Sequence, residues 1–239
     1  VGEQTAAVQG GKAVTVFHME NVHLWDGVAD PYLYSVAASL PDGDAVAVNF
    51  GCRKIDFKPD TGFWLNGRNV RLVGAARHQD RAGIGNALTA AEHEEDMQIL
   101  RDMGANTVRL AHYQHAQYFY DLCDKYGLVA WAEIPYITEH MPEATANTLS
   151  QMEELVLQNY NHPSIICWGL SNEITVTTGV TEDLTANHRL LNDLCHRLDA
   201  TRPTTMAHAF MLDPNDPFVQ LPDICSYNLY YGWYLGELQ

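Results

Sequence analysis

Basic residues are scarce in this chain, and so are paired cysteines. The 239 residues include 14 Lys and Arg against 30 Asp and Glu, which gives a net charge of -16. Nucleic acid is therefore not expected as a partner, because phosphate binding needs a basic surface. The 5 cysteines are odd in number and form no Cys-x-x-Cys pair. Cys123, Cys167 and Cys195 fall in the apolar phase of expected helices or strands, which indicates reduced, packed thiols in a cytoplasmic protein.

Long hydrophobic runs and dinucleotide-binding glycines are also missing. No apolar stretch is long enough to span a bilayer, so no membrane partner is expected. The start, Val1 to Gln4, lacks the basic and apolar regions of a secretory signal, although a chain cut from a longer one would hide its true N-terminus. No Gly-x-Gly-x-x-Gly follows an expected strand. With 46% hydrophobic and 18% charged residues, the composition is typical of a globular protein, with one large domain or one domain and a fragment.

The beginning of the chain has the period-two pattern of antiparallel strands. Tyr34, Val36, Ala38 and Leu40 alternate with small polar residues, and a Pro-Asp-Gly turn leads into a second alternating run that ends near residue 50. A turn at residues 58–62 and the Asn-Gly pair at residues 66–67 predict a further hairpin.

From residue 70 onward the pattern becomes strand, helix, strand, helix. A helix is predicted to begin at Thr89, which has capping-box spacing to Glu92, with Met97, Leu100 and Met103 facing inward. Three more helices are expected around residues 119–126, 152–156 and 191–198. Strands are expected at residues 70–74, 107–110, 128–134, 165–173, 205–210 and 224–229. Repeated βα units predict a parallel sheet, either doubly wound or closed as a barrel.

Polar residues follow the ends of these strands. The segment from Ile165 to Leu170 predicts a strand covered on both faces, and it leads into Asn172 and Glu173. In a parallel barrel the carboxyl ends of the strands form the catalytic face, where a glutamate beside a hydrophobic strand can act as a general acid. The alternative is a strand-end glutamate that caps the following helix. The other strand-end polar residues are His78, Gln79, Asp80, His112, Tyr113, Glu133, His208, Tyr230 and Tyr231.

Two further features bear on this edge of the sheet. Arg109 lies among Val108 and Leu110 inside an expected strand, so it must pair with a carboxylate or point into a polar mouth. Several aromatic residues offer flat faces for sugar C–H groups, with core packing as the alternative role. These aromatic residues are Trp168, Tyr230, Tyr231, Trp233 and Tyr234.

At these positions the sequence resembles glycoside hydrolase family two, and within it the β-galactosidases. The motifs are Arg77-His78-Gln79-Asp80, the run from Asn106 to Tyr113, and the run from Asn161 through Asn172-Glu173. The resemblance implies a partial (β/α)8 TIM barrel over residues 61–239, incomplete at its C-terminus. It also implies an immunoglobulin-like β-sandwich segment over residues 1–60. The sequence departs from the family pattern at Leu110, Gln114 and Ala75-Ala76. The change at Ala76 removes a polar side chain near the sugar subsite and weakens any assignment of the sugar.

The resemblance implies a retaining exo-β-glycosidase with Glu173 as the acid/base. It also implies a substrate-binding set, in which Asn172 holds the sugar 2-hydroxyl and Tyr230 lies beside the nucleophile. This set is His78, Arg109, His112, Asn172 and Tyr230. The expected substrate is a β-galactoside, with β-glucuronides and β-mannosides as alternatives within the family. A non-catalytic carbohydrate-binding fragment is the alternative of a different class.

The nucleophile in this family is a glutamate on barrel strand seven, which we expect to lie beyond Gln239. Glu237 is interpreted as a loop acid. The chain alone is therefore predicted to be inactive, and its uncovered strand edges favour self-association as a homo-oligomer. No cofactor is firmly implied. By analogy with the family, a magnesium site using Glu139, His140 or Glu173 is a further hypothesis, although the spacing around Thr138 differs.

Overall fold

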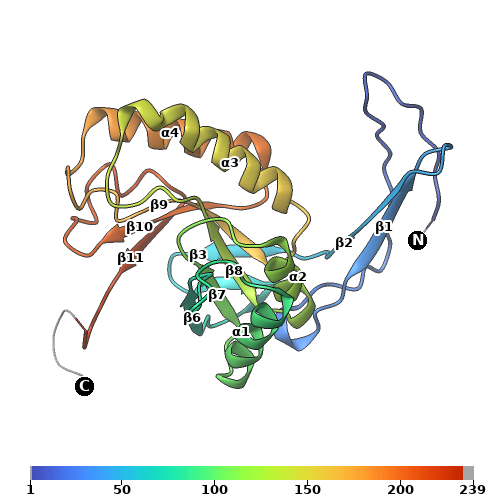
Figure 1. Cartoon of the computed structure of the whole chain (residues 1–239), viewed down its shortest axis with the longest axis horizontal. Coiled ribbons are helices and arrows are strands. Elements are labelled where there is room, and N and C mark those ends of the chain that lie inside the picture. The colour runs from blue at the N-terminus through green and yellow to red at the C-terminus, as the bar shows by residue number, and fades with distance from the viewer. Residues whose placement is uncertain (1, 234–239) are drawn as a thin grey trace.

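The parallel strands of the chain form one six-stranded sheet, in which each strand pairs with the next in sequence order (Figure 1). The computed structural model describes residues 2–233. The strands are β6 (Gly74–Arg77), β7 (Thr107–Leu110), β8 (Val129–Glu133), β9 (Ile165–Asn172), β10 (Thr204–Ala209) and β11 (Ile224–Asn228). In the described part of the chain β6 and β11 each have one partner, so the sheet is an open section of a TIM barrel.

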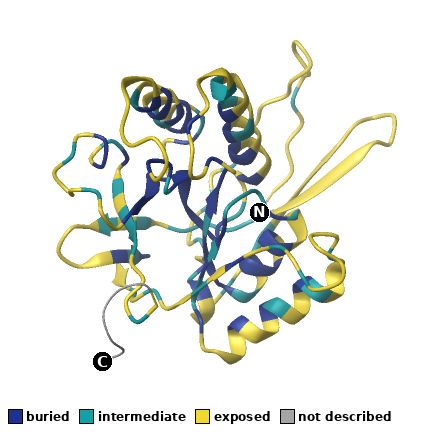
Figure 2. Ribbon diagram, turned by 60° about the vertical axis from the view of Figure 1, so that its left-hand side comes forward, coloured by how far each residue is buried: buried dark blue, intermediate teal, exposed yellow. Residues whose placement is uncertain are grey.

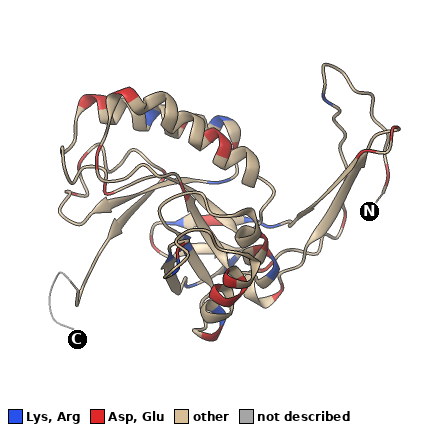
Figure 3. Ribbon diagram, viewed as in Figure 1, with Lys and Arg blue, Asp and Glu red and all other residues tan. Residues whose placement is uncertain are grey.

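Four helices connect the first five of these strands and cover the outer face of the sheet. They are α1 (Ala90–Asp102), α2 (Gln117–Tyr126), α3 (Thr145–Asn159) and α4 (Glu182–Leu198). The helices pack in neighbouring pairs, α1 with α2 and α3 with α4. Their apolar faces are buried against the strands, while their outer faces are exposed (Figure 2). Much of the excess acidic charge lies along the helices (Figure 3).

Local sequence signals explain where the helices begin and end. Thr89 caps α1, and Glu92 reaches back to it, which completes the expected capping box. Gly127 ends α2 in the left-handed conformation, at φ 77°. The prediction that Met103 faces inward is wrong, since 62% of its surface is exposed. Met103 lies six residues after Met97, which is not a whole number of helical turns, and it already forms the C-cap.

The first parallel strand begins later than predicted. It spans Gly74–Arg77 rather than residues 70–74. Gly74 approaches β7 so closely that a Cβ atom there would lie 1.8 Å from the carbonyl oxygen of Thr107. The apolar residues before it serve another cluster, since Val70 and Leu72 pack against a core centred on Trp25. Their hydrophobicity reflects this second core and not a position in the sheet.

That second core closes the amino-terminal end of the parallel sheet. The hairpin strands β3 (Ile55–Lys58), β4 (Gly62–Leu65) and β5 (Arg68–Asn69) form a three-stranded sheet. Phe63 and Leu65 from this sheet join Trp25, Val129 and Ile166, and the last two lie near the starts of β8 and β9. The carboxyl ends of the parallel strands are thus at the opposite end, where a site can form.

The expected antiparallel strands near the start of the chain are present as a separate hairpin. Strands β1 (Tyr34–Ser39) and β2 (Ala45–Phe50) pair in register, and most of their residues are exposed. The hairpin projects away from the barrel section (Figures 1 and 2). An immunoglobulin-like sandwich over residues 1–60 remains a prediction, as does the domain boundary at residue 60.

The connection between β10 and β11 contains turns and no helix in the described residues, so the predicted βα repeat is wrong at this step. Pro214 and Pro217 interrupt any helix here. The side chains of Asp213 and Asp216 accept hydrogen bonds from the backbone amides of Asn215 and Phe218, which stabilises turns in place of a helix. No helix in the part that the structure describes is both long and apolar enough to cross a membrane.

The close contact of Gly127 with the backbone of Gly27 can be tested by substitution. A Cβ atom at Gly127 would lie 2.2 Å from the backbone of Gly27, whereas one at Gly104, which follows α1 with φ 74°, would meet nothing within 4 Å. Both positions penalise alanine for a left-handed φ by about 1–2 kcal/mol. We expect Gly127→Ala to cost at least about 2 kcal/mol more than Gly104→Ala in urea unfolding, because the backbones must also separate. Equal losses would contradict this close packing.

Candidate active site

A hydrogen-bonded polar cluster lies at the carboxyl ends of β7, β8, β9 and β11, with Arg109 of β7 at its centre. The Arg109 guanidinium donates to both carboxylate oxygens of Glu133 on β8, at 3.0 and 3.1 Å. It also donates to the Oδ1 atoms of Asn172 on β9, at 2.7 Å, and Asn228 on β11, at 2.9 Å. The ring of Trp131 lies 4.5 Å from the guanidinium carbon. One arginine therefore connects the ends of four strands.

Glu133 is the fully buried carboxylate of this cluster, with no exposed surface. Besides the two bonds from Arg109, its Oε1 atom lies 2.5 Å from Nδ1 of His112. A buried carboxylate is costly unless it is paired and hydrogen-bonded, and here both oxygens are occupied. Glu133 therefore has a geometry suited to holding Arg109 and His112 in place.

Glu173 differs from Glu133 in that it is only partly buried. Its Oε1 atom accepts a hydrogen bond of 2.8 Å from Nδ2 of Asn228, which also donates to Oδ1 of Asn172 at 2.9 Å. Its backbone has φ 45°, in the left-handed region, directly after β9 ends. Glu173 thus presents a carboxyl group at the mouth of the barrel section, next to the amide of Asn172.

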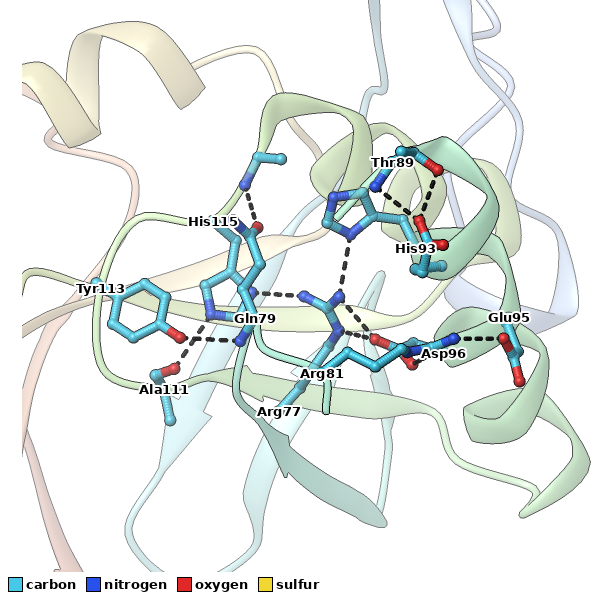
Figure 4. Close-up of polar contacts among 12 residues, drawn as sticks. Arg77, Gln79, Arg81, Thr89, His93, Glu95, Asp96, Ala111, Tyr113 and His115 are labelled. Atoms are coloured by element: carbon cyan, nitrogen blue, oxygen red, sulfur yellow. Dashed lines mark hydrogen bonds and ion pairs between the residues drawn. The ribbon is translucent and has the colours of Figure 1, made fainter. Parts of the chain in front are cut away.

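His78 and His112 lie together on the side of the mouth formed by β6 and β7. Their rings meet edge to face, with centroids 5.2 Å apart. His78 follows β6 directly, and its neighbour Arg77 is buried and paired with Asp96 of α1 at 2.7 Å. Arg77 also donates to Nδ1 of His115, at 3.0 Å (Figure 4). This bond ties the segment after β6 to the segment after β7.

Two more hydrogen bonds join the same segments (Figure 4). The backbone N–H of Gln79 donates to the hydroxyl of Tyr113 at 2.9 Å, and the Gln79 side chain accepts from the N–H of Ala116 at 2.7 Å. Burial lowers the pKa of His115 to about 3, so its ring is neutral and its Nδ1 can accept from Arg77. These contacts fix the backbone on either side of His78 and His112.

The structure brings most of the predicted site residues together. Glu173, Asn172, Arg109 and His112 belong to one hydrogen-bonded cluster, and His78 packs against it. Tyr230 follows β11 and is 37% exposed, and its role beside a nucleophile remains a prediction. Tyr234 and Glu237 lie outside the described residues.

Two members of the cluster received no role from the sequence. The sequence predicts Glu133 only as a strand-end acid, and it predicts no role for Asn228. The signal for Glu133 was available, because Arg109 inside a strand requires a carboxylate partner. The signal for Asn228 was weaker, since a single asparagine after a short, half-buried strand is common in turns.

Magnesium ligands do not come together where the family analogy suggested. Both ring nitrogens of His140 make hydrogen bonds, to the hydroxyl of Tyr136 at 2.5 Å and to Asp183 at 2.6 Å. Glu139 is exposed. The one group of three metal-ligating side chains among the described residues is instead Asp121, Asp124 and His162, in which Asp124 and His162 are already bonded to each other at 2.6 Å. The residues named by the analogy therefore do not fit the ion as a set.

A cavity of about 650 Å³ opens along the concave face of the sheet below this cluster. All six parallel strands contribute to its lining, and Arg109, Trp131 and Asn228 belong to it. In a closed barrel this space is packed with side chains from the strands. We therefore place a substrate above it, at the mouth, beside Glu173.

His208 was expected near the mouth but is buried against the β10–β11 connection, with its ring 5.8 Å from that of Phe218. Burial lowers its pKa to about 4, whereas an unfolded histidine titrates near 6.5. As the pH falls, the His208 imidazole is therefore protonated in the unfolded state before it is protonated in the folded state. The free energy of unfolding should decrease by about 3 kcal/mol for this residue as the pH drops from about 6.5 to 4. We expect His208→Gln to reduce this acid slope in urea unfolding, with His18→Gln at an exposed position as the control. A slope unaffected by His208→Gln would contradict the assignment.

The parallel sheet, its helical cover and the polar cluster at its carboxyl ends define a protein of the TIM-barrel class. The chain belongs to glycosyl hydrolase family 2, since the model of that family's TIM-barrel domain matches residues 58–238. The family resemblance stated from the motifs is therefore confirmed. The fold prediction is confirmed for the partial barrel.

The relatives of this chain include β-glucuronidases and β-galactosidases. The chain is 42% identical to a β-glucuronidase of Bacteroides fragilis over 90% of its length and 32% of that protein. It is 35% identical to a β-galactosidase of Thermoanaerobacterium thermosulfurigenes, over 81% of this chain and 27% of that protein. The solved structure of an FMN-binding β-glucuronidase from F. prausnitzii superposes on this chain with a TM-score of 0.86 and is 44% identical in sequence. The superposition covers 91% of this chain and 34% of the β-glucuronidase chain. The chain therefore spans about a third of the length of these relatives.

Proposed function

We propose that the full-length protein is a retaining exo-β-glycosidase in which Glu173 is the acid/base. The observation that supports this role is the contrast between the two carboxylates at the mouth. Glu133 is fully buried and bonded through both oxygens, whereas Glu173 is partly exposed and held by Asn228. A general acid must reach the leaving oxygen of the substrate, so only Glu173 is suitably placed.

The remaining site residues support a sugar at this mouth. Oδ1 of Asn172 accepts from both Arg109 and Asn228, which leaves the Nδ2 atom to donate to a sugar hydroxyl, the role expected at the 2-hydroxyl. Retaining hydrolysis also needs a nucleophilic carboxylate about 5 Å from the acid. Since Glu133 is occupied, we assign the nucleophile to another segment of the full-length protein.

Within this class, terminal β-glucuronides are our first candidate substrates and β-galactosides the second. The higher identity to a β-glucuronidase, 42% against 35% for a β-galactosidase, favours the glucuronide. The motif resemblance favoured the galactoside. Selectivity would come from groups that contact the sugar outside the hydrogen-bonded cluster, because Arg109 and Glu133 are already paired with each other.

A panel of aryl β-glycosides tests the proposal on the full-length protein. Nitrophenyl β-glucuronide, β-galactoside and β-mannoside should give one clearly preferred substrate, and the product should keep the β configuration in NMR spectra taken early in the reaction. Preference for the galactoside would select the second candidate. Failure to cleave any of them would contradict a glycosidase and support the non-catalytic carbohydrate-binding alternative.

A further inference from the structure

We infer that Ser171 and His188 are positioning residues for the acid/base, fixing the backbone corner from which Glu173 projects. The inference rests on the proposed role of Glu173 and extends it to two residues that do not touch the substrate. Ser171 is the next-to-last residue of β9, and His188 lies in the middle of α4, behind the sheet. Both side chains are buried.

The corner at Glu173 needs support because its backbone conformation is energetically unfavourable. A glutamate at φ 45° lies in the left-handed region, which side chains with a Cβ atom avoid. Such a conformation persists when the surrounding structure fixes it from several directions, and it is common at functional sites. The direction of the Glu173 side chain therefore depends on how firmly the end of β9 is held.

The two edges of β9 supply part of this support through backbone hydrogen bonds. On the β8 side, the N–H of Asn172 donates to the carbonyl of Tyr136 at 3.0 Å, and the N–H of Thr138 donates to the carbonyl of Asn172 at 3.1 Å. On the β10 side, the N–H of Glu173 donates to the carbonyl of Ala207 at 2.8 Å. These bonds hold the corner within the plane of the sheet.

Ser171 and His188 hold the backbone corner at Glu173 in the remaining direction, perpendicular to the sheet. The Ser171 hydroxyl lies 2.8 Å from Nε2 of His188. Nδ1 of His188 lies 2.9 Å from the carbonyl oxygen of Leu184, which can only accept, so Nδ1 carries the proton. In the neutral ring Nε2 then accepts from Ser171. Ser171 of β9 is thus the donor of this hydrogen bond, and His188 of α4 is the acceptor.

The His188 ring is itself held firmly. It is completely buried, stacks on Tyr136 with a centroid distance of 5.1 Å, and meets the edge of Phe218 at 4.9 Å. Tyr136 is also the residue whose carbonyl holds Asn172. The histidine therefore joins α4, the segment after β8 and the end of β9 at one point. Loss of the Ser171 bond frees the corner to move outward and displaces the carboxyl group from the leaving oxygen.

A leaving-group comparison separates this role from a general loss of structure. Protonation by the acid matters for a poor leaving group such as phenol and little for an activated one such as dinitrophenol. For the full-length protein, with the sugar that the wild type prefers, we expect Ser171→Ala to lower kcat/KM for the phenyl glycoside about tenfold and for the dinitrophenyl glycoside less than about twofold.

Variants of the partner and a matched control complete the test. His188→Phe keeps an aromatic ring but removes the acceptor, and should reproduce the effect of Ser171→Ala, whereas His188→Gln keeps an acceptor and should recover part of the loss. Thr148→Val is the control, because Thr148 carries a buried hydroxyl bonded to the neighbouring α4 residue Asn187 and lies on α3. It should leave both substrates unchanged.

Equal losses on both substrates, as misfolding would give, overturn the inference, and so does full phenyl-glycoside activity in Ser171→Ala. An inactive wild type would instead refute the proposed function, and the inference with it.

Discussion

Replacing Glu173 with glutamine is expected to lower kcat/KM of the full-length protein for a phenyl β-glycoside by about three orders of magnitude. The substitution keeps the size of the side chain but leaves no proton to give to the leaving oxygen. The amide can still contact Asn228, whose Nδ2 lies 2.8 Å from Oε1 in the wild type, so we expect the fold to be retained. Steady-state kinetics on phenyl and dinitrophenyl glycosides, with circular dichroism of both proteins, measures the effect.

The activated substrate and added azide distinguish loss of the acid from loss of the base in Glu173→Gln. The dinitrophenyl glycoside should still form the glycosyl-enzyme, and added azide should restore turnover by attacking that intermediate in place of water activated by a base. Glu139→Gln, an exposed acid near the same mouth, serves as the control and should remain close to wild type. Unchanged hydrolysis of the phenyl glycoside by Glu173→Gln would remove Glu173 from the reaction.

The sequence predicted the parallel strands well because each signal was local. The eight residues of β9 are all buried, and the run from Ile165 to Leu170 has the length and composition of a strand covered on both faces. The error at residues 70–74 arose because Val70 and Leu72 are apolar for a different reason. They pack on the core around Trp25, a contact between distant segments that no local pattern reveals. The turns at Pro214 and Pro217 could have been anticipated from the prolines themselves.

The site was predictable where a motif placed a residue at a strand end, and not where its role depends on contacts across strands. Glu173 and Asn172 stand out after a buried strand, and Arg109 stands out inside one. The importance of Asn228 comes from its bonds to Asn172 and Glu173, which are 56 and 55 residues away in the chain. The Ser171–His188 contact spans 17 residues and joins two ordinary polar residues. Neither side chain has a sequence signal of its own.

Arg109→Met is expected to damage both the fold and the activity. The substitution keeps much of the side-chain length but leaves Glu133 fully buried without its cationic partner. Removing one member of a buried ion pair typically costs about 3–5 kcal/mol. Asn172 and Asn228 each lose the donor that Arg109 supplies, so the amide of Asn172 is held less firmly and activity should fall at least about a hundredfold. Urea unfolding and kinetics on the preferred aryl glycoside measure the two losses.

A double variant separates the charge effect from the positioning effect. Glu133→Gln removes the carboxylate that Arg109→Met leaves unpaired, so the double variant should be more stable than the sum of the two single losses implies. Its activity should not recover, because Asn172 and Asn228 still lack the guanidinium. Arg68→Met, which breaks a pair with Asp26 in which the arginine is 53% exposed, should cost less than about 1 kcal/mol. Additive losses of stability in the double variant would contradict a charge pairing between Arg109 and Glu133. Recovery of activity in the double variant would contradict a role for the Arg109 hydrogen bonds to Asn172 and Asn228.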